Sequence, residues 1–300
     1  MRVQLLLVVG VLAPLLQAKH HQTSKKRLRK TKNKKNLSPQ THVKTFTDSQ
    51  VVMNVVDGWN AQSNEFPFYV RGALCGASLI WHDVILSAGH CLGKLQSGTN
   101  GVLVGAAVSG STANGAQWRN ITVEFAHPGF NMTALDYDMM VAKLESPVTN
   151  PALQPVTLNR QMWVPRPGSQ VTAIGFGRIS ETGPVPTTLQ MVNLTSLSAK
   201  QCTRQYAKFN TPVNPLTMLC TLGRGRGGVC FGDSGGPLLL NGLQVGITSW
   251  TLACGTKRYP DVYTRLAVAI DWIEQQICLL SKVPPDSCSN QVHNPSASGN

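Results

Sequence analysis

The sequence is poor in acidic residues, with 14 Asp and Glu against 27 Lys and Arg. The imbalance is uneven along the chain: residues 19–54 hold ten basic residues and one acid, whereas residues 55–300 hold 16 basic and 13 acidic residues. A nucleic-acid-binding protein carries its basic surface on the folded domain. Because most of the excess charge lies in one short segment instead, we expect no nucleic acid among the partners.

Long apolar runs are also lacking. No stretch after the amino terminus approaches the ~20 apolar residues of a membrane-spanning helix, so we expect no membrane span. The run Leu5–Leu16 follows Arg2 and ends in Leu-Gln-Ala at Ala18, a pattern typical of a secretory signal peptide. We therefore assign residues 1–18 to a signal peptide and expect a secreted, extracellular protein.

Residues 19–35 contain few apolar side chains among many lysines and arginines, a composition that favours disorder. We interpret residues 19–54 as a basic propeptide that is removed during maturation. A transient contact with an acidic polysaccharide or a membrane surface is a second interpretation of its charge.

No Cys-x-x-Cys spacing occurs among the eight cysteines, although this spacing is typical of structural zinc sites. We therefore expect no metal and no cofactor. Behind a signal peptide, an even number of cysteines indicates disulfides instead.

The segment Cys230–Pro237 places Ser234 among glycines. Such a run is usually a turn, but glycines also let backbone N–H groups, here those of Gly232 and Ser234, point at one spot and hold an oxyanion. A serine nucleophile also needs a base that takes its proton. The functional interpretation therefore depends on a base elsewhere in the chain.

His90, in the motif Leu-Ser-Ala-Gly-His-Cys, and Asp138, just before an apolar run, supply the base and its partner. With Ser234 they follow the order His, Asp, Ser, and the chain resembles the trypsin/chymotrypsin family of serine proteases over Val55–Ile277. Asp136 is an alternative acid. The resemblance selects Asp138, because the family's acid immediately precedes a buried strand.

The resemblance implies a mechanism. Ser234 attacks the scissile carbonyl, His90 accepts its proton and later donates it, and Asp138 orients the imidazole. Ser249 matches the serine that supports the family's Asp, and Gly89 replaces the usual Ala before the base. The implied activity is that of a serine endopeptidase, which hydrolyses protein or peptide substrates through an acyl-enzyme.

Short apolar or alternating runs between turn residues predict an all-β protein. The resemblance specifies two six-stranded antiparallel β-barrels, with the active site in the cleft between them, in a protease domain of residues 55–278. Helical periodicity is convincing only at Leu266–Ile277 and predicts a C-terminal α-helix. The expected strands include Phe68–Val70, Ala77–Trp81, Val84–Ser87, Gly101–Val104, Thr122–Phe125, Met140–Leu144, Val171–Gly175, Leu238–Leu240 and Leu243–Ser249.

The resemblance also implies how the cysteines pair. Two cysteine pairs common in vertebrate members are missing, and the apolar residues at their positions suggest packing contacts instead of bridges. These residues are Ala61 and Met191 for one pair, and Val171 and Leu240 for the other. The implied disulfides are Cys75 with Cys91, Cys202 with Cys220 and Cys230 with Cys254, and Cys278 and Cys288 are left to close a local loop.

The motif Val-Val-Asp-Gly that begins at Val55 resembles the mature amino terminus of the family. There, a newly freed ammonium pairs with the carboxylate just before the nucleophile, here Asp233. The resemblance therefore implies a zymogen. Asn54 precedes the bond where the family usually has Arg or Lys, and Asp57 replaces a usual Gly, so we expect an activating protease that prefers Asn.

The resemblance places Gly228 at the base of the primary specificity pocket, where trypsins carry Asp, and Ser249, Trp250 and Thr251 along its wall. Asp261 stands where trypsins have Gly. The combination of Gly228, Val229, Phe231 and Asp261 resembles the neutrophil elastase group, which implies a preference for small aliphatic residues before the cleaved bond. A trypsin-like preference through Asp261 is the alternative.

Asn120, Asn131 and Asn193 each begin an Asn-x-Ser/Thr sequon and are candidate glycosylation sites on surface loops. Residues 279–300, rich in Ser, Pro and Asn, are expected to form a flexible C-terminal tail.

A catalytically silent protease homologue, which keeps the fold as a binding module, is the competing class of function. The presence of all three triad residues makes it the weaker interpretation. A zymogen that is never cut between Asn54 and Val55 would be silent as well.

Overall fold

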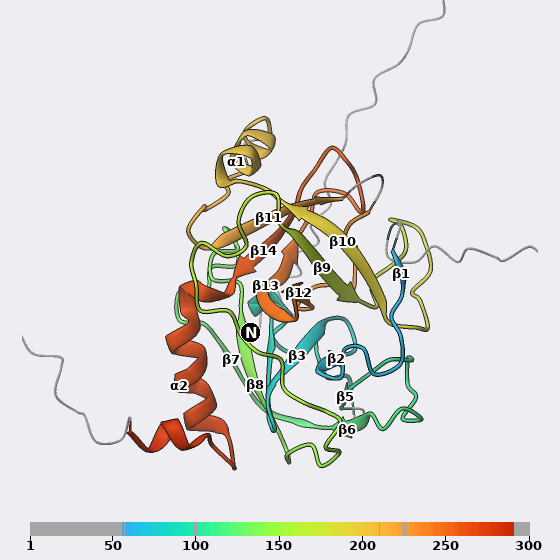
Figure 1. Cartoon of the computed structure of the whole chain (residues 1–300), viewed down its shortest axis with the longest axis vertical. Helices are drawn as coiled ribbons and strands as arrows, with labels where there is room; N and C mark the ends of the chain where they lie inside the picture. Colours follow the sequence, from blue (N-terminus) through green and yellow to red (C-terminus); the bar gives the residue numbers. More distant parts are fainter. Residues whose placement is uncertain are drawn as a thin grey trace, which may run out of the picture. The chain divides into compact units, whose positions relative to one another are not determined.

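The computed structural model describes residues 56, 58–98, 101–209, 211–223, 225 and 227–290 of the 300-residue chain. The expected signal peptide and basic propeptide, with Asn54 and Val55, lie outside these residues. The described part is built mainly from two seven-stranded antiparallel sheets, one from each half of the chain (Figure 1). No helix in this part is long and apolar enough to cross a membrane.

The first sheet has the order β6-β5-β2-β3-β4-β8-β7. Its central strands are rich in Val, Ile and Leu, which suit a pleated and buried surface, and every residue of β4 is buried. The strands are β2 (Tyr69–Arg71), β3 (Gly76–Trp81), β4 (Val84–Ser87), β5 (Val102–Val104), β6 (Gln117–Arg119), β7 (Ile121–Ala126) and β8 (Met140–Leu144). Among the described pairings β6 and β7 remain edges, so this half has seven strands and is open where the sequence predicted a six-stranded barrel.

The second sheet closes on itself. Its ring runs β9-β10-β11-β14-β13-β12 and returns to β9, and the short strand β1 pairs with β10 outside the ring. The strands are β1 (Trp59–Asn60), β9 (Gln170–Gly175), β10 (Gln190–Ser196), β11 (Met218–Gly223), β12 (Pro237–Leu240), β13 (Leu243–Trp250) and β14 (Asp261–Arg265). The prediction of an all-β fold with a six-stranded barrel is confirmed in this half.

Several strands fall outside the expected list, and β10 shows why. Its buried residues alternate with Met, Asn and Thr on the other face, so no continuous apolar run marks it. In the ring it lies between β9 and β11, and pairing on both sides holds it in place. The missing cysteine pair at Val171 and Leu240 is replaced by packing, as expected: Val171 is buried, and Leu240 packs against the same apolar cluster.

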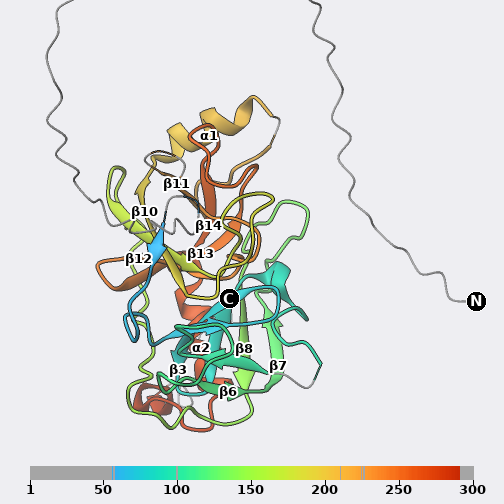
Figure 2. The ribbon, with the colours of Figure 1, turned by 90° about the vertical axis from the view of Figure 1, so that its right-hand side faces the viewer.

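The described residues form two α-helices, both in the second half of the chain. Helix α1 (Ala199–Ala207) was not predicted, although Ser198 and Gln201 form a capping box that marks its start. Helix α2 (Ile270–Leu280) confirms the C-terminal helix, but its first expected turn, Leu266–Ala269, is a 3₁₀ helix. Figure 2 shows α1 at the far end of the second half, while α2 packs against β8 of the first.

Residues 279–290, which were expected to belong to a flexible tail, include the end of α2 and a segment that is packed on the first sheet. Beyond α2, Ser281 and the backbone of Lys282 donate hydrogen bonds to the two carboxylate oxygens of Asp83, at 2.6 and 2.7 Å. The indole N–H of Trp81 donates to the carbonyl of Val283 at 2.7 Å. Asp83 is fully buried, so its charge needs these donors, and they hold the chain after α2 on the first sheet.

Four disulfides are present, and they are the pairs that the resemblance implies. They join Cys75 to Cys91, Cys202 to Cys220, Cys230 to Cys254 and Cys278 to Cys288. The last pair closes the segment after α2, where packing alone involves few apolar side chains.

Candidate active site

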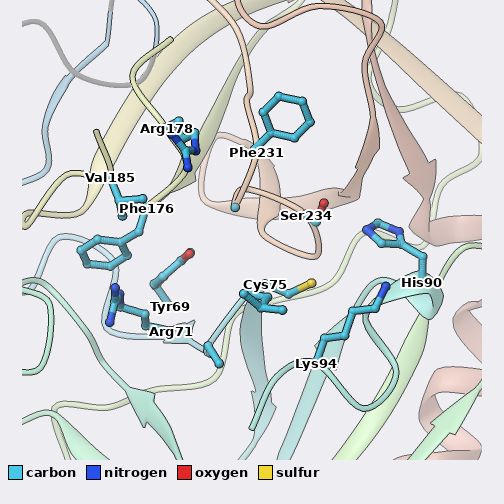
Figure 3. A pocket seen from close by; sticks show the side chains of 14 residues that line it. Tyr69, Arg71, Cys75, His90, Lys94, Phe176, Arg178, Val185, Phe231 and Ser234 are labelled. Atoms are coloured by element: carbon cyan, nitrogen blue, oxygen red, sulfur yellow. The ribbon is translucent and has the colours of Figure 1, made fainter. Parts of the chain in front are cut away.

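A cavity of about 410 Å³ lies where the two halves meet, and His90 and Ser234 both line it. The first half contributes residues from β2, from the loop between β2 and β3, and from the segment after β4, and the second half contributes the segments after β9 and before β12. In Figure 3 the hydroxyl of Ser234 and the imidazole of His90 face each other across this opening.

Strand pairing brings His90 and Asp138 together. Ser87, the last residue of β4, pairs with Met140, the first residue of β8. His90 follows the end of β4 by three residues and Asp138 precedes β8 by two, so the register places both at the same edge. Nδ1 of His90 lies 2.8 Å from Oδ2 of Asp138, and the backbone N–H of His90 donates to Oδ1 at 2.8 Å.

Asp138 is fully buried and has several hydrogen-bond donors around it. Besides His90, the hydroxyl of Ser249 donates to Oδ2, and the hydroxyl of Thr264 donates to the Asp138 carbonyl at 2.8 Å. A buried carboxylate that accepts several hydrogen bonds can hold a charge beside an imidazole. With the Nδ1 proton directed at Asp138, Nε2 of His90 is left as a proton acceptor.

The alternative acid, Asp136, bonds to a residue of the second half of the chain. Its carboxylate accepts a hydrogen bond from the Thr217 hydroxyl at 2.6 Å, which joins the loop to the second half. Between the two acids, Tyr137 has a φ of 47°, a left-handed conformation that is uncommon for a bulky residue. This turn lets the neighbouring acids point to different partners, and Asp138 is the one against His90.

The glycine before the base has a steric reason. A Cβ atom at Gly89 would lie 2.9–3.1 Å from ring carbons of Phe130. The aromatic ring therefore fills the space of the methyl group that the family usually has there, and it supports the 3₁₀ turn Gly89–Cys91 that carries His90. The Cys75–Cys91 disulfide holds the same turn to the start of β3.

The backbone around Ser234 is fixed by both halves. The carbonyl of Ser234 accepts a hydrogen bond from Gly76 N–H at 2.8 Å, and the N–H of Gly235 donates to the Thr248 carbonyl at 2.8 Å. Gly235 has a φ of +79°, and a Cβ there would lie 2.1 Å from the hydroxyl of Ser87, so only glycine fits.

The peptide between Phe231 and Gly232 is held by a backbone hydrogen bond. Its carbonyl accepts the N–H of Arg178 at 2.8 Å. In a trans peptide the N–H points away from the carbonyl, so the Gly232 N–H is directed away from Arg178. Gly232 has a φ of +101°, which glycine adopts readily, and it lines the cavity together with Ser234.

Asp233 points away from the cavity into the second half. It is buried, and its carboxylate accepts the N–H groups of Gly177 at 2.7 Å and Cys230 at 2.9 Å. Burial raises the pKa of Asp233 to about 6, although these hydrogen bonds oppose the rise. A Cβ at Gly175 or Gly177 would collide with this carboxylate. Its predicted partner, the Val55 ammonium, lies outside the described residues.

The predicted primary pocket contains a carboxylate held by the protein itself. Asp261 is 3% exposed, and its Oδ2 accepts the backbone N–H of Val229 at 3.0 Å. A Cβ on Gly228 would lie 2.8 Å from the same oxygen. The Thr251 hydroxyl lies within reach of this carboxylate and also 3.1 Å from the Ala253 carbonyl. Burial raises the pKa of Asp261 to about 7.

Comparison with known proteins identifies the family. The family model described as trypsin matches residues 55–273. The chain belongs to the trypsin family. Kallikrein 1-related peptidase b24 of Mus musculus is 33% identical over 243 residues, which cover 75% of this chain and 90% of the mouse protein. Glandular kallikrein of Sus scrofa is 34% identical over 74% of this chain and 96% of its own length, and trypsin of Sus scrofa is 33% identical over 74% and 95%.

This trypsin-family protease is therefore a serine endopeptidase, a hydrolase that acts on protein substrates. None of these three relatives is named an elastase, so the elastase-like pocket stays a prediction.

One group of side chains has the spacing of a metal site. The possible ligand atoms of Cys75, His90 and Cys91 lie within 4.8 Å of one another, but both sulfurs are in one disulfide and cannot act as thiolate ligands.

The predicted glycosylation sites differ in setting. Asn131 is exposed in a loop, and Asn120, between β6 and β7, hydrogen bonds to Glu145 at 3.0 Å. Asn193 is exposed but lies within β10, not on a loop, and its side chain accepts the Thr172 hydroxyl.

Sequence reasoning missed part of the cavity. Arg71, Lys94, Phe176 and Arg178 line it beside the predicted residues. They belong to separate segments, and no motif marks any of them.

Proposed function

We propose that the protease is a secreted enzyme, made as a zymogen, in which Ser234 is the nucleophile, His90 the general base and Asp138 the group that orients it. The observation that carries this assignment is the buried Asp138, which contacts both His90 and Ser249 beside the cavity that Ser234 lines. The N–H groups of Gly232 and Ser234 would hold the oxyanion of the tetrahedral intermediate.

The proposed sequence of steps follows from these positions. Ser234 Oγ adds to the scissile carbonyl while Nε2 of His90 takes its proton. The protonated imidazole is stabilised by Asp138 and returns the proton to the leaving amine. Water then repeats the sequence on the acyl-enzyme and releases the acid.

Labelling with a fluorophosphonate, which reacts with an activated serine, tests this assignment. We expect the mature protein to be labelled and the Ser234→Ala variant to be unlabelled. No labelling in any form of the protein would favour the silent homologue instead.

We infer that activation requires a cut after Asn54, because the motif at Val55 resembles a mature amino terminus and Asp233 is a buried carboxylate without a cationic side chain among its described partners. An ammonium brought beside Asp233 would lower its raised pKa and stabilise its charge. Sequencing the amino terminus of the secreted, active form checks this inference, and a start other than Val55 would overturn it.

For the residue before the cleaved bond, we propose small aliphatic side chains. The Asp261 carboxylate is committed to the Val229 N–H, and a pKa of about 7 leaves it largely neutral in mildly acid solution. A neutral, buried acid offers little to a substrate cation. Val229 and Thr251 complete a pocket wall without an exposed charge.

A trypsin-like preference is the second candidate, because the Asp261 carboxylate lies directly against Gly228 at the base of the pocket. Peptides that differ only before the cleaved bond, as Val, Ala or Arg, separate the two. The ratio of Arg to Val cleavage at each pH removes any pH dependence that the two peptides share. A ratio well above one that rises through pH ~7, as Asp261 ionises, would favour the trypsin-like candidate.

A further inference from the structure

The 410 Å³ cavity lies on the leaving-group side of Ser234. It is lined by His90, Gly232 and Ser234, but by none of the primary-pocket residues Gly228 and Asp261. The predicted pocket wall of Ser249, Trp250 and Thr251, along which the residues before the cleaved bond would run, does not line the cavity either, so the cavity is left for the residues that follow this bond. Three extended residues span about 10 Å, the scale of a cavity of this volume.

Three cationic side chains line this cavity, and no acidic one does: Arg71, Lys94 and Arg178. They come from β2, from the segment after the 3₁₀ turn Gly89–Cys91, and from the segment after β9. Figure 3 shows Lys94 and Arg178 reaching toward the cavity from facing walls. Among the described residues, ion pairs within 4.0 Å join only His90 to Asp138 and Arg160 to Glu274, so the three cations have no carboxylate partner there.

Arg71 also has an unmet hydrogen-bonding capacity. Its guanidinium lies over the ring of Phe176, 5.0 Å from the centroid, and its Nε is buried without a hydrogen-bond partner. A buried donor without an acceptor is unusual in native proteins. Arg178 donates one hydrogen bond, from Nη1 to the Gly183 carbonyl at 3.0 Å, and a guanidinium has five N–H donors. Both side chains therefore have donors to spare.

We propose that this cationic cavity selects substrates with Asp or Glu within the first three residues after the scissile bond. The selection rests on the proposed protease function. A carboxylate there would meet three positive charges that no side chain of the cavity neutralises, and it would supply acceptors for guanidinium donors. The nearby carboxylate of Asp233 does not compete, because it is buried and already bonded to Gly177 and Cys230.

Paired peptides test the proposal. Each pair carries Val before the cleaved bond, an amidated C-terminus, and either Glu or Gln at the first, second or third position after the bond. For at least one position we expect kcat/KM of the mature enzyme to be about tenfold higher with Glu, since several partly exposed charges act together. A Glu-to-Gln exchange on the other side of the cleaved bond, ahead of the Val residue, is expected to change kcat/KM less than about twofold.

Charge-removing variants locate the effect. Arg178→Gln and Lys94→Gln are each expected to lower the Glu-to-Gln ratio about two- to threefold, and the double variant to bring it near two. The Arg71→Gln variant removes the buried Nε donor, and it too is expected to lower the Glu-to-Gln ratio. Lys200→Gln is the matched control, because Lys200 is exposed on α1 and does not line the cavity; its ratio should equal that of the unchanged enzyme.

The outcomes separate this proposal from the protease assignment. If the enzyme is labelled by fluorophosphonate and cuts the Gln peptides, but Glu gives no advantage at any position, the charge selection is overturned and the protease assignment stands. A Glu advantage that survives in the double variant and in Arg71→Gln also overturns it. If the mature enzyme neither reacts with the probe nor cuts any peptide, both the charge selection and the protease assignment are overturned.

Discussion

In the proposed substrate-binding cleft, the two sides of Ser234 hold their charges in different ways. On the acyl side, the carboxylate of Asp261 is buried and bonded to the Val229 N–H. On the leaving-group side, Lys94 and Arg178 are exposed in a cavity without an acidic side chain. A buried charge that is bonded to the protein's own backbone has little hydrogen-bonding capacity left for a substrate, whereas exposed cations without a carboxylate partner among the described residues remain available to one. The position of a charge, and not its presence in the cleft, decides whether it can select substrates.

The largest expected effect tests what the two sides share. In Asp138→Asn, the amide cannot hold the His90 tautomer that leaves Nε2 free, so kcat should fall by about 10⁴, the loss seen for this change in the family's template. Because the triad serves both sides, the loss should be the same for Glu and Gln peptides. Steady-state kinetics measure it, with thermal unfolding as the control for folding. A loss confined to one class of peptide would break the comparison.

Removing the Ser249 hydroxyl should have a smaller effect of the same kind. It takes away a hydrogen bond to the buried Asp138 carboxylate, and such bonds to a charged group are worth about 1.5–3 kcal/mol. We expect Ser249→Ala to lower kcat about tenfold with little change in KM, because Ser249 acts through Asp138. A change in KM alone would show that Ser249 contacts substrate instead of positioning the acid.

Ionic strength should affect the substrate preferences on the two sides of the cleaved bond differently. Raising the ionic strength from about 0.05 M to about 0.5 M shortens the screening length of exposed charges about threefold. The preference for Glu over Gln after the cleaved bond should therefore fall about threefold. The preference for Val over Ala before the bond should not fall, since apolar burial is not screened. Equal sensitivity of both preferences to salt would contradict the comparison.

The smallest expected kinetic effect is that of Asp261→Asn, which should change Val-peptide cleavage less than about twofold, because Asn can still accept the Val229 N–H. Stability gives the sharper readout. The folded pKa of about 7 lies above the ordinary 3.8, so the wild-type protein loses stability as pH rises from that value through about 7. The Tm advantage of Asp261→Asn should grow between about pH 5 and about pH 8. A constant difference would mean that the pKa of Asp261 is not raised, because the carboxylate would then be ionised in both the folded and the unfolded protein over this pH range.

The fold was predictable where its signals are local. Runs such as Val84–Ser87 and Met140–Leu144 are strands at the expected positions, and the C-terminal helix follows from its periodicity. The open edge of the first sheet, the 3₁₀ start before α2 and the packed segment after it were not predictable. The packed segment depends on a distant partner, because Asp83 accepts the backbone N–H of Lys282.

For the site, the sequence alone predicted which residues act as the nucleophile, the base and the acid. Short motifs around Ser234 and His90 carry their own steric requirements, because glycines and turns act over a few residues. The disulfide next to His90, between Cys75 and Cys91, was predicted from the family resemblance and is present.

Only the tertiary structure decided the charge on either side of the nucleophile. Arg71, Lys94 and Arg178 lie far apart in the sequence and meet at one cavity because three separate segments border it. Likewise, Asp261 is a buried acid with a raised pKa only because the Val229 backbone and the pocket wall enclose it. Electrostatic energies depend on distance and burial, and both are set by the packing of the two halves.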